Sequence, residues 1–233
     1  MSAMSGTTTT DRQGPGDQPS GSHSTSRRLT AEERRRQLFD QALTLFAERG
    51  YAATTMDDIA EAAGVTKPLV YQHFDSKRAL YLELLDSFSH ALIERIGTAT
   101  AAAEGPRQQV EEGMAAYFEM MVDNEQSFRL IYGRDAPDDP ELGEALRRVE
   151  DTIAQAIDPL IDAGLEPEHR LLLAYSVVGM VEGASRLWLG RDVPPITTAE
   201  DGDGISGISS EASLLASRVA DLAWAGLRQV HRD

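Results

Sequence analysis

One stretch of the sequence, between positions 54 and 77, carries a set of side chains that can hydrogen-bond to an external partner. Lys67, Tyr71, Gln72 and His73 lie close together there, and apolar residues occupy the intervening helical positions. A helix that only faces water usually carries Glu and Lys, so this set indicates a surface with a binding role. Ammonium, phenol, amide and imidazole groups can hydrogen-bond to the phosphates and base edges of DNA. The stretch therefore favours nucleic-acid recognition.

Two short helices joined by a tight turn would position these side chains. Thr55 and Asp58 have the spacing of a capping box at the start of the first helix. Gly64 stands where the chain must adopt a left-handed backbone conformation to end that helix. Thr66 can cap the second helix, and Pro68 lies in its first turn, where a missing N–H costs least. The pattern predicts a helix-turn-helix, whose second helix enters the major groove of DNA. The alternative, a helical hairpin buried in a core, does not account for the polar set.

The same stretch resembles the DNA-binding domain of TetR-family transcriptional regulators. The resemblance is carried by Gly64-Val65-Thr66-Lys67 and by Val70-Tyr71-Gln72-His73-Phe74-Asp75-Ser76-Lys77, and it covers roughly residues 34–85. It implies that the residues nearest the base edges are Lys67, Leu69, Tyr71 and Gln72. It implies that phosphates are held mainly by Thr54, Thr55, Thr66, Tyr71, His73 and Lys77. Pro68 stands where many members of the family have a smaller residue, which leaves the DNA contacts at Pro68 open.

The resemblance also implies how the chain assembles and what regulates it. Members of the family are homodimers that bind palindromic operators, and their last two long helices pair into a four-helix bundle. The residues that we expect at such a dimer interface are Leu187, Leu215, Val219, Leu222 and Gly226. The larger domain of the family encloses a small-molecule pocket, for which the candidates are Phe88, Met114, Tyr117, Phe118, Met121, Phe128, Tyr132, Tyr175 and Gly179. Each pocket candidate taken alone also fits an ordinary hydrophobic core.

Two short segments, residues 128–132 and 178–183, resemble actinobacterial regulators of fatty-acid synthesis that sense long acyl-CoA. This second resemblance implies a fatty acyl-CoA, or another lipophilic metabolite, as the effector. The main hypothesis is thus a ligand-responsive repressor; the alternatives are an activator and an architectural DNA-binding protein without an effector. An enzyme with an added helix-turn-helix has no support from a nucleophile or an acid–base pair. The five histidines lack metal-ligand spacing, so we expect neither a metal nor a cofactor.

The distribution of charge is compatible with DNA binding although the 233-residue chain has a formal net charge of −16. From Arg27 to Leu80 there are nine Lys/Arg against eight Asp/Glu, and from Tyr81 onward twelve against twenty-eight. The chain has two lysines, Lys67 and Lys77, which bracket the second predicted helix. Because nearly all of the acidity lies outside the motif, the local potential allows phosphate to approach.

Apolar residues recur at helical spacing through the rest of the chain and predict an all-α fold of about nine helices. We expect a disordered tail over 1–28, a three-helix helix-turn-helix domain over 29–76, and a helical effector-binding and dimerisation domain over 77–233. One helix is expected to end at Gly164 and a loop to span 194–209. The most apolar run, 171–189, contains a Glu and an Arg, and the chain has no Cys. These features predict no membrane span and a cytoplasmic location.

Overall fold

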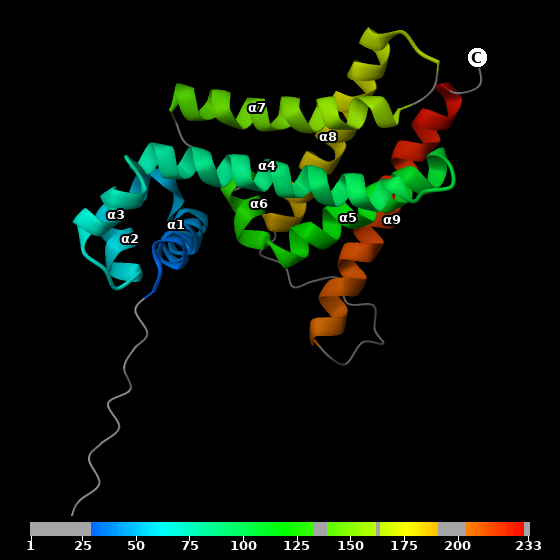
Figure 1. The fold of residues 1–233 in the computed structure, drawn as a ribbon. Helices are drawn as coiled ribbons and strands as arrows, with labels where there is room; N and C mark the ends of the chain where they lie inside the picture. Colours follow the sequence, from blue (N-terminus) through cyan, green and yellow to red (C-terminus); the bar gives the residue numbers. More distant parts are fainter. Residues whose placement is uncertain (1–28, 133–138, 162–163, 191–203, 231–233) are drawn as a thin grey trace, which may run out of the picture.

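The structure is a computed structural model that describes residues 29–132, 139–161, 164–190 and 204–230. Within these ranges the chain contains no strand and forms one 3-10 turn, η1 (Asp158–Leu160), and nine α-helices: α1 (Ala31–Ala53), α2 (Met56–Ala62), α3 (Lys67–His73), α4 (Lys77–Ala101), α5 (Pro106–Asp123), α6 (Glu125–Tyr132), α7 (Pro140–Ile157), α8 (Pro167–Leu189) and α9 (Gly204–Val230). The predicted all-α fold is confirmed. Figure 1 shows α1–α3 gathered at one end of the molecule and α4 running from them along the other helices. The expected tail, 1–28, lies outside the described residues.

Local signals in the sequence set the ends of the first helices. Thr55 Oγ1 accepts a hydrogen bond from the Asp58 amide at 3.1 Å, and the Asp58 carboxylate accepts one from the Thr55 amide at 2.7 Å, so the predicted capping box is confirmed. Gly64 has a φ of 64°, the left-handed conformation that was predicted. Thr66 occupies the predicted N-cap position of α3, but the capping hydrogen bond expected from its side chain is not formed.

Two later boundaries differ from the sequence-based expectation. The helix expected to end at Gly164 ends at Ile157 instead, and a 3-10 turn follows. Pro159 explains the early end, because its ring and missing N–H prevent an α-helix from continuing. The last helix begins at Gly204, inside the expected loop over 194–209, of which residues 194–203 lie outside the described part of the chain.

A single hydrophobic core connects the helix-turn-helix to the rest of the chain. It extends without interruption from Leu38 in α1 to Leu227 in α9. Tyr81 of α4 lies at the junction, where its ring packs edge-on to Phe46 with centroids 5.3 Å apart and its hydroxyl donates to the Leu130 carbonyl of α6 at 3.0 Å. Helix α4 therefore contacts both the helix-turn-helix and the helices beyond it. No helix in the described ranges is long and apolar enough to span a membrane.

Candidate functional site

The outer face of α3 carries exposed residues of the kind that contact DNA. Lys67, Tyr71 and Gln72 are exposed, and Tyr71 retains 44% of its surface. Val70 on the opposite face of the helix and Phe74 directly after it are buried in the hydrophobic core, and α3 packs against α2. The helix therefore presents its polar side to solvent, in the orientation that a recognition helix requires.

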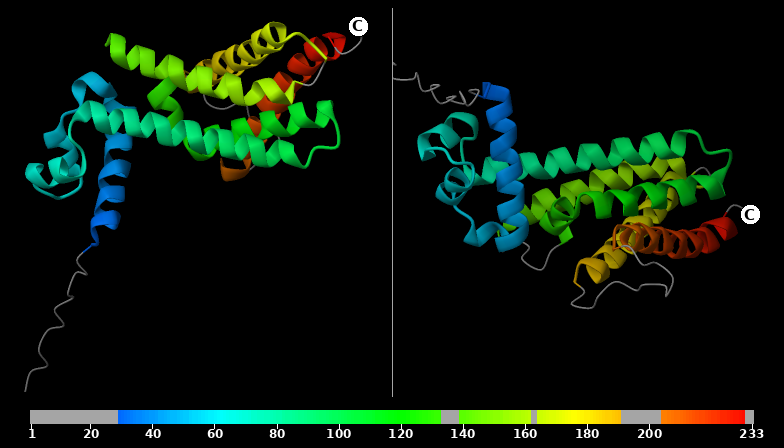
Figure 2. Two further views of the ribbon diagram at one scale, coloured as in Figure 1. Left: turned by 45° about the horizontal axis from the view of Figure 1, so that its top comes forward. Right: turned by 90° about the horizontal axis from the view of Figure 1, so that it is seen from below.

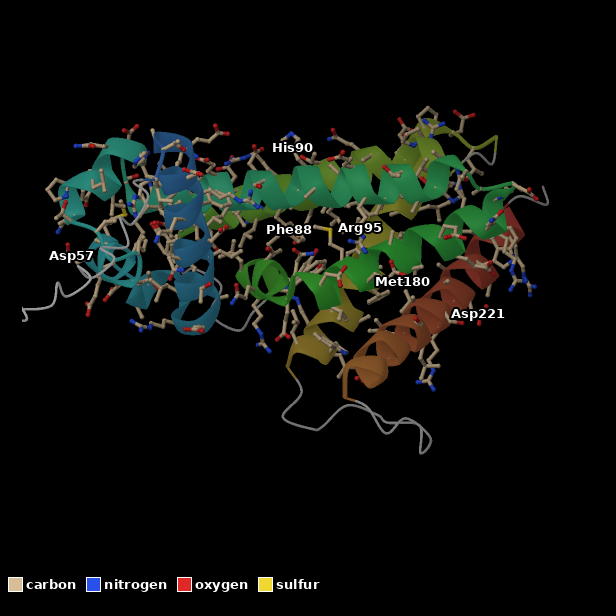
Figure 3. All side chains as sticks on the ribbon, turned by 60° about the horizontal axis from the view of Figure 1, so that its bottom comes forward. Asp57, Phe88, His90, Arg95, Met180 and Asp221 are labelled. Atoms are coloured by element: carbon tan, nitrogen blue, oxygen red, sulfur yellow. The ribbon has the colours of Figure 1, made fainter. Side chains whose placement is uncertain are left out.

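Asp57 of α2 pairs with Lys67, an interaction that the sequence reasoning missed. Its carboxylate accepts a hydrogen bond from Lys67 Nζ at 2.8 Å, and both side chains are more than half exposed. The hydrogen bond to Asp57 raises the pKa of Lys67, so the ammonium group stays charged at neutral pH. An exposed pair of this kind is weak and can exchange for a phosphate or a base edge. Figure 3 shows Asp57 at the end of the molecule that the helix-turn-helix occupies.

The other predicted DNA contacts divide into surface and interior positions. Thr55, Thr66 and Pro68 are exposed, whereas Leu69 and His73 are half-buried. Thr54 is fully buried, and its hydroxyl donates to the carbonyl of Gly50 at 2.9 Å and lies 3.2 Å from that of Leu45. A phosphate contact through the Thr54 side chain does not fit this placement.

The Lys77 side chain also makes its hydrogen bonds within the protein. Its Nζ donates to the carbonyls of Tyr51 and Thr54 at 2.7 and 2.8 Å and lies 4.1 Å from the centre of the Tyr51 ring. Burial lowers the pKa of Lys77 below its ordinary value. Thr54 and Lys77 therefore tie the end of α1 to the start of α4. The polarity of both residues was visible in the sequence, but their carbonyl partners were not.

A second feature is an apolar cavity in the larger group of helices. Its walls come from α4, α5, α7, η1, α8 and α9, with one residue from α6, and its volume is about 80 Å³. The lining residues are Ile96, Thr100, Pro106, Gln109, Val110, Gly113, Met114, Tyr117, Tyr132, Ile153, Ile157, Leu160, Ile161, Val177, Val178, Val181, Ala223, Trp224 and Leu227. Thr100 donates its hydroxyl to the Ile96 carbonyl at 2.9 Å, so this polar side chain is already satisfied. A lining of this composition suits an apolar ligand.

The structure brings three of the nine predicted pocket residues, Met114, Tyr117 and Tyr132, to the cavity wall. Four others, Phe88, Phe118, Met121 and Phe128, are buried in the core beside the cavity. In Figure 3, Phe88 points from α4 into the molecule, whereas the labelled His90 lies on the outer side of that helix.

The last two predicted pocket residues lie on the outer side of α8. Tyr175 keeps 39% of its surface and donates to Asp151 at 2.7 Å, and Gly179 is exposed. Sequence reasoning missed the wall that α7 supplies through Ile153 and Ile157. Their apolar periodicity was visible, but not which of their neighbours left a space.

Two tyrosine hydroxyls lie among the apolar walls. The Tyr117 hydroxyl and Ser185 Oγ are 2.9 Å apart, and Ser185 is fully buried on α8. Burial raises the pKa of Tyr117 well above its usual range and that of Tyr132 to about 12. Both phenols therefore stay neutral. In the described part of the chain no buried side-chain nitrogen or oxygen lacks a hydrogen-bond partner, so the cavity does not demand a polar ligand atom.

Large apolar side chains are exposed on the last two helices. Leu187 on α8 and Leu222 on α9 keep 63% and 64% of their surfaces, Gly226 is exposed, and Leu215 and Val219 are half-buried. Both views in Figure 2 show α8 and α9 lying together along one side of the molecule. The five residues predicted for a dimer interface therefore lie on one pair of neighbouring helices.

Comparison with known proteins identifies the class of regulator. Residues 38–84 match the family model described as "Bacterial regulatory proteins, tetR family". The transcriptional activator FasR of Mycolicibacterium smegmatis is 34% identical over 188 residues, which cover 80% of this chain and 85% of FasR. The transcriptional repressor KstR2 of Rhodococcus jostii is 39% identical over 99 residues, 42% of this chain and 48% of KstR2.

Solved structures agree with the fold. FadR from Bacillus subtilis in complex with stearoyl-CoA superposes with a TM-score of 0.66 at 16% identity, over 82% of this chain and 98% of FadR. FadR from Bacillus halodurans gives a TM-score of 0.67 at 18% identity, over 84% and 96%. Since FasR aligns along most of its length, and the family match falls on the helix-turn-helix, this chain belongs to the tetR family of DNA-binding transcriptional regulators and is not an enzyme.

Proposed function

We propose that this regulator is a homodimer that binds a palindromic DNA operator and changes its DNA affinity when a lipophilic effector enters the cavity. The observation that carries the proposal is the path of α4. This helix begins at Lys77, four residues after α3 ends, and its other end contributes Ile96 and Thr100 to the cavity wall. A ligand that favours one position of α4 would therefore also favour one position of α3.

Recognition of DNA is assigned to the exposed side of α3. Lys67, Tyr71 and Gln72 are placed to reach base edges in the major groove, with Leu69 beside them. Thr55, Thr66 and His73 are assigned to phosphates, which fix the register of the helix on the duplex. Tyr71 and Pro68 complete the contact surface. Thr54 and Lys77 support it by holding the end of α1 and the start of α4.

The dimer is assigned to the exposed apolar residues of α8 and α9. Leu187 and Leu222 would be covered by a second copy, with Leu215, Val219 and Gly226 beside them. Burial of large side chains is the main driving force for association, and a two-fold axis through this face repeats the same patch on both copies. The two copies of α3 would then enter major grooves one helical turn, about 34 Å, apart.

The effector is assigned to the class of long aliphatic compounds, with fatty acyl-CoA as the first candidate. The apolar walls favour such a chain, and the comparisons include a FadR described in complex with stearoyl-CoA. We place the helix-turn-helix in residues 29–76 and the effector-binding and dimerisation part in 77–233, in a protein that works in the cytoplasm, where DNA is accessible. Repression, which the family resemblance implies, and activation, which the name of FasR carries, differ in where the operator lies relative to the promoter.

A binding selection on random duplex DNA tests the proposal first. The purified full chain should enrich a palindrome, and a fatty acyl-CoA should change its affinity for that palindrome. Weak binding without sequence preference would refute the operator and leave an architectural DNA-binding protein. An enriched palindrome whose affinity no lipophilic compound changes would refute the sensor alone. Mapping the palindrome against the promoter then distinguishes a repressor from an activator.

A further inference from the structure

The cavity ends abruptly partway along the molecule. On α5 its lining positions run from Pro106 through Gly113 and Met114 to Tyr117, at the spacing of one helical face, and stop there. The next inward-facing residues on that helix, Met120 and Met121, are buried but do not line the cavity. The inward face of α5 therefore lines the cavity as far as Tyr117 and is packed into the core beyond it.

The same boundary occurs on α4 and α8. On α4 the wall consists of Ile96 and Thr100, whereas Leu92, one turn nearer the helix-turn-helix, is fully buried outside it. On α8 the last lining residue is Val181, and Ser185, one turn further, is fully buried. The cavity therefore closes at the level of Tyr117 on all three helices.

Tyr117 is fixed at this boundary by contacts on two sides. Its hydroxyl bonds to Ser185 Oγ at 2.9 Å, which prevents the ring from swinging along the cavity axis. Behind it, the Phe128 ring packs edge-on with centroids 5.3 Å apart, and Phe128 packs in turn on Phe88 at 4.9 Å. A chain that enters from the mouth meets a supported ring and not a loose side chain.

We propose that Tyr117, held by Ser185, is the residue that sets the maximum length of the aliphatic chain this protein accepts. The inference rests on the proposed lipophilic effector and adds its length. From the exposed Pro106 to the buried Tyr117 the helix rises about 16 Å, the length of an extended chain of roughly a dozen methylene groups. Carbons beyond that length add no binding affinity, because the Tyr117 ring blocks their entry.

Calorimetric titration with straight-chain saturated acyl-CoA thioesters of increasing length, each below its micelle concentration, tests this assignment. For the wild type, affinity should rise about fourfold for each added methylene group and then level off at the floor. Tyr117→Leu should move the levelling-off point to chains longer by about two to three carbons, because it opens space where the ring stood. Tyr117→Phe keeps the ring and its packing on Phe128 but loses the hydrogen bond to Ser185, so it should move that point by less than Tyr117→Leu does.

Phe118→Leu is the matched control, since Phe118 is fully buried on the same helix but does not line the cavity. It should lower stability without moving the levelling-off point, and circular dichroism confirms that each variant is folded. If Tyr117→Leu binds the series with the wild-type chain-length dependence, Tyr117 is not the floor. If the wild type binds no chain of any length, the lipophilic effector itself is refuted.

Discussion

Removal of the Tyr81 hydroxyl should weaken the connection between α4 and α6 by a predictable amount. Tyr81 is 1% exposed, and its hydroxyl donates to the Leu130 carbonyl at 3.0 Å. In Tyr81→Phe the ring keeps its edge-on contacts with Phe46 and Tyr51, at 5.3 and 5.0 Å, so hydrophobic packing changes little. What is lost is one buried hydrogen bond, and the carbonyl loses the tyrosine hydroxyl as its donor.

Such a loss costs about 1 to 3 kcal/mol in the free energy of unfolding. For a chain of this size that lowers the Tm by roughly 2–4 °C per kcal/mol. Urea unfolding of both proteins at one fixed concentration is the assay, because association with a second copy contributes to the measured stability. The midpoint should fall while the slope with denaturant stays constant, which indicates an unchanged folded state.

Tyr71→Phe is the matched control, since Tyr71 is 44% exposed and its variant should stay within about 0.5 kcal/mol of the wild type. If Tyr81→Phe unfolds at the same urea concentration as the wild type, the hydrogen bond to Leu130 does not stabilise the junction. The Tyr81 hydroxyl would then not be one of the contacts that hold α4 to α6.

Three further predictions concern the DNA surface, the dimer face and a contact between α4 and α7. Tyr71→Ala should lower affinity for the selected operator at least about tenfold while the mass in solution stays that of the wild type, since the residue is assigned to base edges; unchanged affinity in an anisotropy titration would contradict the orientation of α3. Leu222→Arg should reduce the mass measured by light scattering to that of a monomer. Leu172→Arg is the control, because Leu172 is equally exposed on α8 but lies outside the assigned interface, and it should leave the mass unchanged. If Leu222→Arg stays dimeric, the interface lies elsewhere. Arg78 donates a hydrogen bond to Asp139 at 2.7 Å and thereby lowers the pKa of that carboxyl group. The contact therefore stabilises the folded state fully above the unfolded-state pKa of Asp139, and this stabilisation is lost as the pH falls through the folded-state pKa. Stability of Asp139→Asn should therefore decline less than that of the wild type between neutral and acid pH, and parallel pH curves for the two proteins would contradict the contact.

The features that sequence predicted correctly are those that depend on neighbouring residues. The capping box of Thr55 and Asp58 closes within four residues, and the left-handed turn at Gly64 needs only the absence of a side chain. The four-residue spacing of the apolar Val70 and Phe74 likewise indicated which side of α3 presents Lys67 and Tyr71 to solvent. In each case the partner lies within one or two helical turns, so the spacing in the sequence carries the structural information.

Tertiary structure decided the features that join distant positions. Thr54 and Lys77 were predicted to contact DNA phosphates at the surface. In the structure their side chains instead donate hydrogen bonds to carbonyls near the end of α1. Tyr117 and Phe118 are adjacent aromatics of similar size, and only the packing of the surrounding helices places one at the cavity and the other in the core. The sequence alone, through its helical spacing and its resemblance to a known family, indicated a helical DNA-binding regulator and predicted α3 as its recognition helix. The position and the length of the cavity between the other helices depend on contacts between residues many positions apart. The separation of such residues in the sequence does not indicate their distance in space.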